Sequence, residues 1–243
     1  MSEHISRRNL PHWYMPGAAH FVTYRLAGTI PIEILRGWRD ERERLLRAER
    51  ELPPSEQLRL HKHFFARYDR YLDERCERPW LHKPEIAEIV RDNLYHHHGS
   101  RYELLAYCVM PNHVHILVQP LEKEARCVKE VASSPTGNMI LSDEFNDARS
   151  PLASIMHSLK SYTANIVNAR LGRRGQLWQH ESYDHWVRDM EELERIINYI
   201  RLNPVRAGLC SKPHDWPFSS ARDRFDRDRD ESGLIGRLRE DWH

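Results

Sequence analysis

Two histidines separated by one residue, His113 and His115, lie in the apolar segment HVHILVQ (113–119). Successive side chains of a β-strand point to opposite faces, so both imidazoles would share one face while the residues between them enter a core. Their Cα atoms would stand about 6–7 Å apart, close enough for both rings to reach one cation. Because imidazole binds several divalent metals, the segment predicts a metal site. Two polar residues on the solvent face of a strand would show the same pattern.

A tyrosine and an asparagine one helical turn apart, Tyr199 and Asn203, form the second candidate pair. Apolar spacing in EELERIINYIRLNP (191–204) predicts an amphipathic helix with both residues on the border of its apolar stripe. A phenol can attack phosphorus, and an amide oxygen one turn away can complete a metal site formed by two histidines. A free phenol has a pKa of about 10, so a metal, a base or water must help remove its proton. A tyrosine packed at a helix edge, with the asparagine as a C-terminal cap, is the other interpretation.

Four elements are predicted in the N-terminal half of the chain. HFVTYRL (20–26) is rich in β-branched and aromatic residues and predicts a first strand. Charged segments with helical apolar spacing at 32–51 and 55–75 predict two surface helices with a solvated charged face. Pro84 is expected to open a helix that runs to about Tyr95.

The second half is predicted to begin with an antiparallel hairpin, formed by strands at 101–110 and 113–119 with the turn at Pro111 and Asn112. The polar segment 120–150 predicts a loop, and 151–171 predicts a helix. The segment GQLWQHESYDHWV (175–187) is a short strand or loop.

The last predicted helix has a clear start and stop. Asp189 is expected to cap it, with Glu192 as its capping-box partner, and Pro204 to end it. Residues 222–243 form a charged tail. This succession of strands and helices in 243 residues indicates a compact α/β or α+β protein, with one domain or one domain and an insertion.

The balance of charge gives no global sign of nucleic-acid binding, because Lys and Arg number 37 against 36 Asp and Glu, a net charge of +1. One stretch differs, since no acidic residue occurs from Ala148 to His180. A DNA backbone with unstacked bases would suit such a stretch, through charge and aromatic stacking. The candidate DNA-binding residues there are Arg149, Lys160, Arg170, Arg173, Arg174 and Trp178. An ordinary surface helix is the other interpretation.

Four scattered cysteines without CxxC spacing favour reduced thiols over a disulfide framework or a zinc site. The N-terminal segment lacks the apolar run of a signal peptide, and no stretch approaches the ~20 apolar residues that span a bilayer. We therefore expect a soluble, cytoplasmic protein.

Several segments, taken together and in order, resemble one known family. They are HFVTYRLAGTIP (20–31), CVMPNHVHILV (108–118), SLKSYTANIVNARLG (158–172), LWQHESYDHWVRD (177–189), YIRLNPVRAGL (199–209) and DWPFSS (215–220). The likeness, over residues 10–35 and 78–221, is to the REP-associated tyrosine transposases, relatives of the IS200/IS605 single-tyrosine transposases in the HUH endonuclease superfamily.

The resemblance implies an α+β, ferredoxin-like antiparallel sheet flanked by helices. His113, His115 and Asn203 match the family's metal ligands, Asn203 standing where the insertion-sequence relatives have glutamine, and Tyr199 matches the nucleophile. Such enzymes use Mg²⁺ or Mn²⁺ to cut single-stranded DNA near a hairpin, form a 5′-phosphotyrosine link and rejoin strands, as monomers or homodimers. The departures are a helical insertion at about 32–78 and a loop insertion at about 120–150, within a single domain at 1–221.

Two other functions stay open. A metal-dependent phosphoesterase would use the histidines without covalent chemistry, and a non-catalytic regulator would bind hairpin DNA without cutting it. Tyr162 and Tyr183 are rival nucleophiles, and Tyr199 is preferred because a candidate metal ligand lies one helical turn from it.

Overall fold

A four-stranded antiparallel sheet forms the centre of the computed structural model, which describes residues 4–7, 11–48, 54–75, 78–121 and 150–222. Its strand order is β4-β5-β3-β6, with β3 spanning His20–Arg25, β4 Tyr102–Val109, β5 His113–Pro120 and β6 Tyr183–Trp186. Helix α3 (Pro84–His97) connects β3 to β4, and α5 (Pro151–Arg170) lies between β5 and β6. This β-α-β-β-α-β order confirms the predicted ferredoxin-like α+β fold.

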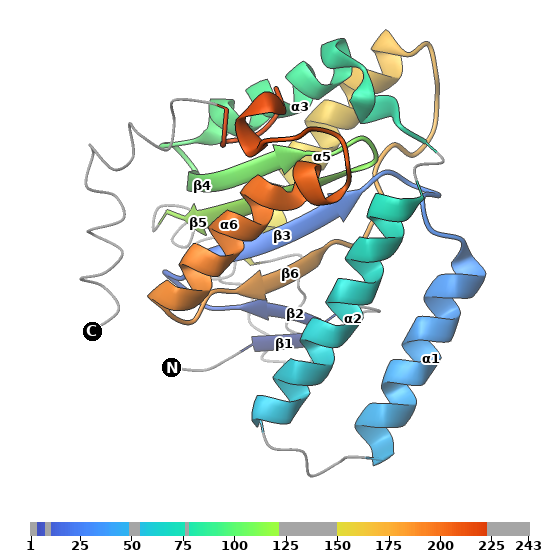
Figure 1. Cartoon of the computed structure of the whole chain (residues 1–243), viewed down its shortest axis with the longest axis vertical. Coiled ribbons are helices and arrows are strands. Elements are labelled where there is room, and N and C mark those ends of the chain that lie inside the picture. Colours follow the sequence, from blue (N-terminus) through green and yellow to red (C-terminus); the bar gives the residue numbers. More distant parts are fainter. Residues whose placement is uncertain (1–3, 8–10, 49–53, 76–77, 122–149, 223–243) are drawn as a thin grey trace, which may run out of the picture.

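Helices cover both faces of the sheet (Figure 1). Helices α3 and α5 pack on one face, where Val22 and Tyr24 of β3 join their core. On the other face lies α6 (Met190–Arg206), packed against Phe21 of the same strand. Helix α2 (Pro54–Glu74) lies beside α6, and α1 (Ile32–Ala48) packs outside α2. Strand alternation on β3 thus separates two apolar cores.

Short elements complete the described chain. Strands β1 (His4–Arg7) and β2 (Pro11–Tyr14) form a separate antiparallel pair, which the sequence did not predict. Two 3₁₀ turns occur, η1 at Trp80–His82 and η3 at Pro213–Asp215. The predicted loop insertion at 120–150 and the tail at 222–243 lie almost entirely outside the described residues.

Helix α6 starts where the sequence predicted but continues past its proline. The Asp189 carboxylate accepts a hydrogen bond from the Glu192 N–H at 2.7 Å, as expected of a cap. The prediction that Pro204 ends the helix is wrong, because α6 runs to Arg206. The Asn203 carbonyl accepts from the Ala207 N–H at 2.9 Å, so the last turn keeps its own hydrogen bond although proline donates none.

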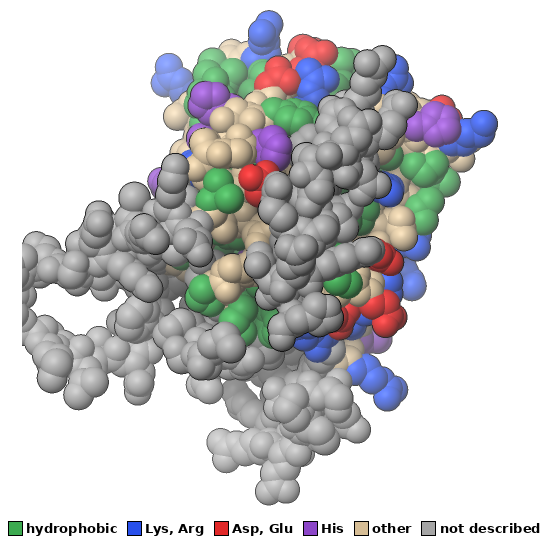
Figure 2. Space-filling view, turned by 90° about the vertical axis from the view of Figure 1, so that its left-hand side faces the viewer, with side chains coloured by type: hydrophobic (Ala, Val, Ile, Leu, Met, Phe, Trp, Pro, Cys, Tyr) green, Lys and Arg blue, Asp and Glu red, His purple; other side chains and the backbone are tan. Residues whose placement is uncertain are grey.

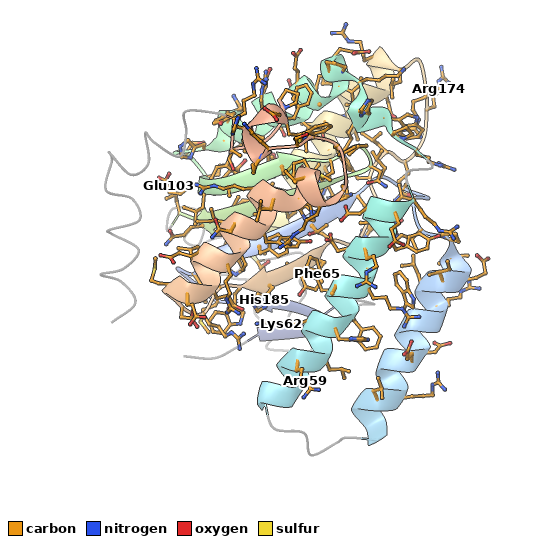
Figure 3. All side chains as sticks on the ribbon, viewed as in Figure 1. Arg59, Lys62, Phe65, Glu103, Arg174 and His185 are labelled. Carbon is orange, nitrogen blue, oxygen red and sulfur yellow. The ribbon has the colours of Figure 1, made fainter. Side chains whose placement is uncertain are left out.

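Helix α2 keeps the exposed charged face that the sequence predicted, but its other side is buried, which the sequence did not predict. It buries Tyr68, Asp69 and Leu72 against the rest of the molecule. Lys62 lies 3.2 Å from the Glu192 carboxylate of α6, and Phe65 stacks on the Tyr183 ring of β6 with centroids 4.2 Å apart. Figure 3 shows Lys62 and Phe65 where α2 meets β6. The Lys62 ion pair and the Phe65 ring contact therefore hold α2 against α6 and the sheet.

Charges of both signs are interspersed on the described part of the face in Figure 2, as the balanced composition predicts. None of the helices in the described part of the chain is long and apolar enough to cross a membrane.

Glu192 offers a test of how α2 is held. Its side chain is 4% exposed and lies 3.2 Å from Lys62, His185 and Arg188. Burial alone would raise the pKa of Glu192, but hydrogen bonds from His185 and Arg188 lower it well below 4.5. We expect Glu192→Gln to lower the free energy of unfolding by about 2–3 kcal/mol at pH 7, measured by urea denaturation.

The pH dependence has a definite sign. A carboxyl with a depressed folded pKa stabilises the fold above its unfolded pKa, and that stabilisation disappears as the pH falls toward the folded value. The difference between the native protein and Glu192→Gln should therefore shrink below about pH 4.5. The control Glu191→Gln removes an exposed neighbouring charge and should cost under about 0.5 kcal/mol. Equal effects of the two substitutions would contradict this account.

Candidate active site

The two histidines of β5 face each other in a buried position. Both are 0% exposed, and their Nε2 atoms lie 3.0 Å apart. Two nitrogens bound to one cation at about 2.1 Å and at right angles to each other would have a separation of about 3.0 Å. The geometry of His113 and His115 therefore suits two ligands of one metal ion, as the alternation of the strand predicted.

Hydrogen bonds at the other ring nitrogens hold both imidazoles. The Nδ1 of His113 lies 2.6 Å from Asn112 Oδ1, an acceptor, so that nitrogen carries the proton and Nε2 keeps its lone pair. The Nδ1 of His115 lies 2.8 Å from Thr23 Oγ1, its cross-strand neighbour on β3. Contacts of this kind orient ligand histidines in metal sites.

Both histidines are neutral at physiological pH. Burial lowers the pKa of His113 to about 3, with a smaller contribution from His115, and burial also lowers the pKa of His115 to about 3. Neutral rings supply lone pairs, which is the state that binds a metal.

Helix α2 adds a carboxylate that the sequence did not predict. Asp69 Oδ1 lies 3.4 Å from His115 Nε2, and one ligand atom from each of Asp69, His113 and His115 lies within 4.8 Å of the others. Asp73, one turn further along α2, has its Oδ1 3.8 Å from His113 Nε2. The group formed by Asp69, His113 and His115 could hold a metal ion.

Buried oxygens without hydrogen bonds support this fit. Asp69 Oδ1, Asp73 Oδ1 and Asn203 Oδ1 are all buried and have no hydrogen-bond partner among the described residues. Burial raises the pKa of Asp69, and it raises the pKa of Asp73 to about 7. A bound cation would give the carboxylate oxygens a partner and offset the cost of burying their charge.

The β4–β5 turn fixes the position of α2. Asn112 Nδ2 donates to the Leu72 carbonyl at 2.9 Å and to the Arg75 carbonyl at 3.2 Å, both at the C-terminal end of α2. The same asparagine accepts from His113 through its Oδ1, so one side chain links the helix to the histidine pair.

Tyr199 meets this cluster from α6. Its hydroxyl donates a hydrogen bond to Asp69 Oδ2, and its ring lies edge-on to His115 with centroids 5.6 Å apart. Asn203 Nδ2 lies 3.4 Å from the same hydroxyl. Burial and the neighbouring Asp69 raise the pKa of Tyr199 well above 10, so the phenol is protonated and needs a base to react.

The rival tyrosines lie elsewhere. Tyr162 is 53% exposed on α5, which packs on the opposite face of the sheet from the histidine pair. Tyr183 is buried on β6, where its ring packs against Phe21 and Phe65. Among the three candidates, Tyr199 contacts the histidine–aspartate cluster through its hydroxyl.

The predicted DNA-binding patch is not one open surface. Trp178 is 4% exposed and its indole N–H donates to Thr163, so this ring has no open face on which a base could stack. Lys160 donates to the carbonyls of Gln179 and His180 at 3.0 Å, which ties α5 to the next segment. A stacking role for Trp178 and a free phosphate-binding role for Lys160 do not fit this geometry.

The remaining members of the patch differ among themselves. Arg173 lies over the Trp80 ring at 4.2 Å and donates to the Gln176 carbonyl. Arg170 and Arg174 are exposed, and Figure 3 shows Arg174 at the far end of the molecule from His185. Arg149 lies outside the described residues.

The overlooked carboxylates left a weak signal in the sequence. Asp69 and Asp73 are four residues apart and follow apolar residues at helical spacing, so they lie on one face of α2. In a helix with this many charges, such a pair resembles a solvated face.

Comparison with known proteins connects the chain with one family. No protein-family model matches it. A candidate REP-associated tyrosine transposase of Haemophilus influenzae is 27% identical over 119 residues, which are 49% of this chain and 58% of that protein. A REP-associated tyrosine transposase of Escherichia coli K12 is 35% identical over 44 residues, 18% of this chain and 27% of that protein. The chain is a relative of the REP-associated tyrosine transposases.

The matched segments cover only part of these REP-associated tyrosine transposases, 58% of the first and 27% of the second. A solved structure of a REP-associated tyrosine transposase bound to a REP hairpin aligns with 94% of this chain and 85% of its own, at 19% identity and a TM-score of 0.43.

In this relative of the REP-associated tyrosine transposases, metal binding can be tested at Asp69. Loss of residues that merely support a metal site weakens binding about 10–100-fold, so Asp69→Asn should weaken Mn²⁺ binding at least about tenfold in calorimetric titration. Asp92→Asn removes an exposed carboxylate on α3 and should leave the Mn²⁺ affinity unchanged. Equal affinities of the two variants would exclude Asp69 as a ligand.

Proposed function

We propose that the chain is a single-tyrosine HUH nuclease that cuts and rejoins single-stranded DNA beside hairpins. The observation that carries the proposal is the contact of the Tyr199 hydroxyl with Asp69, whose other oxygen lies 3.4 Å from His115. A candidate nucleophile, a candidate base and candidate metal ligands thus lie close together within one subunit. The names of the curated relatives support the substrate class.

His113, His115 and Asp69 would hold Mg²⁺ or Mn²⁺, with Asn203 Oδ1 as a further oxygen ligand. The bound cation would act as a Lewis acid on the phosphate and orient it for in-line attack. The fit rests on the 3.0 Å separation of the two Nε2 atoms and on the buried oxygens that lack hydrogen bonds.

In the proposed cleavage step, Tyr199 Oη attacks the phosphorus. Asp69 Oδ2, which accepts the hydrogen bond from this hydroxyl, takes the phenolic proton. The Oη–P bond forms while the P–O3′ bond breaks, and the departing O3′ takes a proton from water to become a 3′-OH. A 5′-phosphotyrosine remains, and attack by a 3′-OH on this linkage reverses the step and rejoins a strand.

Tyr199→Phe removes the attacking oxygen. Incubation with end-labelled single-stranded hairpin DNA from beside the gene and Mn²⁺ should give a denaturation-resistant protein–DNA adduct with the native protein and none with the variant. Tyr162→Phe, which removes an exposed hydroxyl from the opposite face, should form the adduct at the native rate.

Two results would favour the other functions. Cutting by Tyr199→Phe without an adduct would indicate a metal-dependent phosphoesterase. Hairpin binding by the native protein without any cutting in Mg²⁺ or Mn²⁺ would indicate a non-catalytic regulator.

A further inference from the structure

Arg206 lies on the same face of α6 as the candidate nucleophile. It follows Tyr199 by seven residues and Asn203 by three, spacings that place side chains on one side of a helix. Helical side chains lean toward the N-terminus, and the Arg206 guanidinium reaches back to lie 5.5 Å from the centroid of the Tyr199 ring. The residue is exposed, so this cation is open to a ligand from solution.

Arg206 has no ion-pair partner among the described residues, unlike Arg188, which directly precedes the α6 cap, and Arg195 within α6. Arg188 pairs with Glu192 at 3.2 Å, and Arg195 lies 4.0 Å from Glu191. Among the described residues, no carboxylate lies within 4.0 Å of the Arg206 guanidinium.

The charge of Arg206 nevertheless acts on the candidate site. It lowers the pKa of Asp69, of Asp73 and of Tyr199, in each case against the larger effect of burial. The guanidinium is therefore near the carboxylates and the phenol without being neutralised by a direct ion pair.

A cavity of about 280 Å³ connects this end of α6 with the candidate metal ligands. Asp73 and His113 line one part of it, and Ala207 and Leu209, at the C-terminal end of α6, line another. Ala207 directly follows Arg206 in the chain. Arg206 itself does not line the cavity, but a phosphate that reached His113 through it would lie beside the end of α6 that carries Arg206.

We propose that Arg206 binds a non-bridging oxygen of the phosphodiester that Tyr199 attacks. The inference rests on the proposed function and adds a catalytic residue to it. In their ionised forms, Asp69 and Asp73 would repel an anionic phosphodiester, and the Arg206 guanidinium beside the candidate nucleophile would oppose that repulsion. An N–H of the guanidinium would donate to that oxygen, so the same contact stabilises the charge that develops during attack.

A purely structural role makes a different prediction. A cation in the last turn of a helix interacts favourably with the helix dipole and stabilises the fold by a modest amount. In that case, substitution would lower the melting temperature and leave the rate of the chemical step unchanged.

The first test compares Arg206→Gln and Arg206→Lys with Arg195→Gln, a control on the same helix whose arginine lies beside Glu191. Rates of adduct formation are measured in a single turnover with saturating hairpin DNA and Mn²⁺. We expect Arg206→Gln to be about 10–100-fold slower than the native protein. Arg206→Lys, which keeps the charge but not the planar donors, should lie between them, and Arg195→Gln should stay within about twofold of the native rate.

The second test uses hairpin DNA with a methylphosphonate at the scissile position, in each of its two stereoisomers. Both isomers are uncharged at the scissile position, and in one of them a methyl group replaces the oxygen that contacts Arg206, so that contact is lost. For that isomer, the native protein and Arg206→Gln should form adduct at rates within about threefold of each other. For the other isomer, which keeps the contacted oxygen without its negative charge, Arg206→Gln should still be slower than the native protein, by a smaller factor than on ordinary DNA.

The outcomes separate the two levels of the proposal. Adduct formation by Arg206→Gln at the native rate would overturn the role of Arg206 alone, as would an equal loss on ordinary DNA and on both methylphosphonates. Failure of the native protein to form any adduct would overturn the proposed function itself. Unchanged melting temperatures for the Arg206 variants, together with slow adduct formation, would support a contact with the phosphate.

Discussion

The buried carboxylate of Asp69 is the group on which the candidate active site depends. Through Oδ1 it faces His115, and through Oδ2 it accepts the hydroxyl of Tyr199. An ionised carboxylate in a buried position is costly unless a positive charge or hydrogen bonds compensate for it. Oδ2 accepts a hydrogen bond from Tyr199, whereas Oδ1, which faces the histidines, has no hydrogen-bond donor among the described residues. The carboxylate therefore lacks a compensating partner on that side.

Two positive groups could supply the charge that the Asp69 carboxylate lacks. A metal cation between the imidazoles and Asp69 would supply positive charge in the buried part of the site, which the neutral histidines do not provide. At the surface of the same site, Arg206 lies over the ring of Tyr199 and is free of ion pairs among the described residues. A phosphodiester placed between the cation and Arg206 would have a positive charge on each side of it.

The scaffold positions these groups with elements from three parts of the chain. The register between β3 and β5 places Thr23 opposite His115, and the Thr23 hydroxyl orients the imidazole through its contact with Nδ1. The helix that carries Asp69 is tied to the β4–β5 turn by Asn112 and to α6 by Lys62 and Glu192. Helix α2 is therefore part of the candidate site, and residues away from the reacting groups set the geometry of its carboxylate.

Local pattern was sufficient for the parts of the molecule that depend on local geometry. Alternation along 113–119 predicted that His113 and His115 share a face, and helical spacing predicted that Tyr199 and Asn203 do. The order of strands and helices indicated only an α/β or α+β protein, and the resemblance implied the ferredoxin-like antiparallel sheet that the structure confirms.

Tertiary packing decided what local pattern could not. The position of Asp69 depends on docking of α2, which a charged amphipathic sequence does not reveal. Trp178 is buried because its ring packs against Tyr24 with centroids 4.8 Å apart, whereas its basic neighbours in the sequence suggested an open surface. Helix α6 continues past Pro204 because the carbonyls of its last turn accept hydrogen bonds from the N–H groups of Ala207, Gly208 and Leu209.

The most direct test of the central claim is anomalous diffraction from crystals of the protein loaded with Mn²⁺. The account predicts one strong peak within about 2.0–2.5 Å of the Nε2 atoms of both His113 and His115 and of an Asp69 oxygen, with the Tyr199 hydroxyl beside it. A fully loaded protein whose Mn²⁺ lies elsewhere, with the two imidazoles hydrogen-bonded to each other, would contradict it.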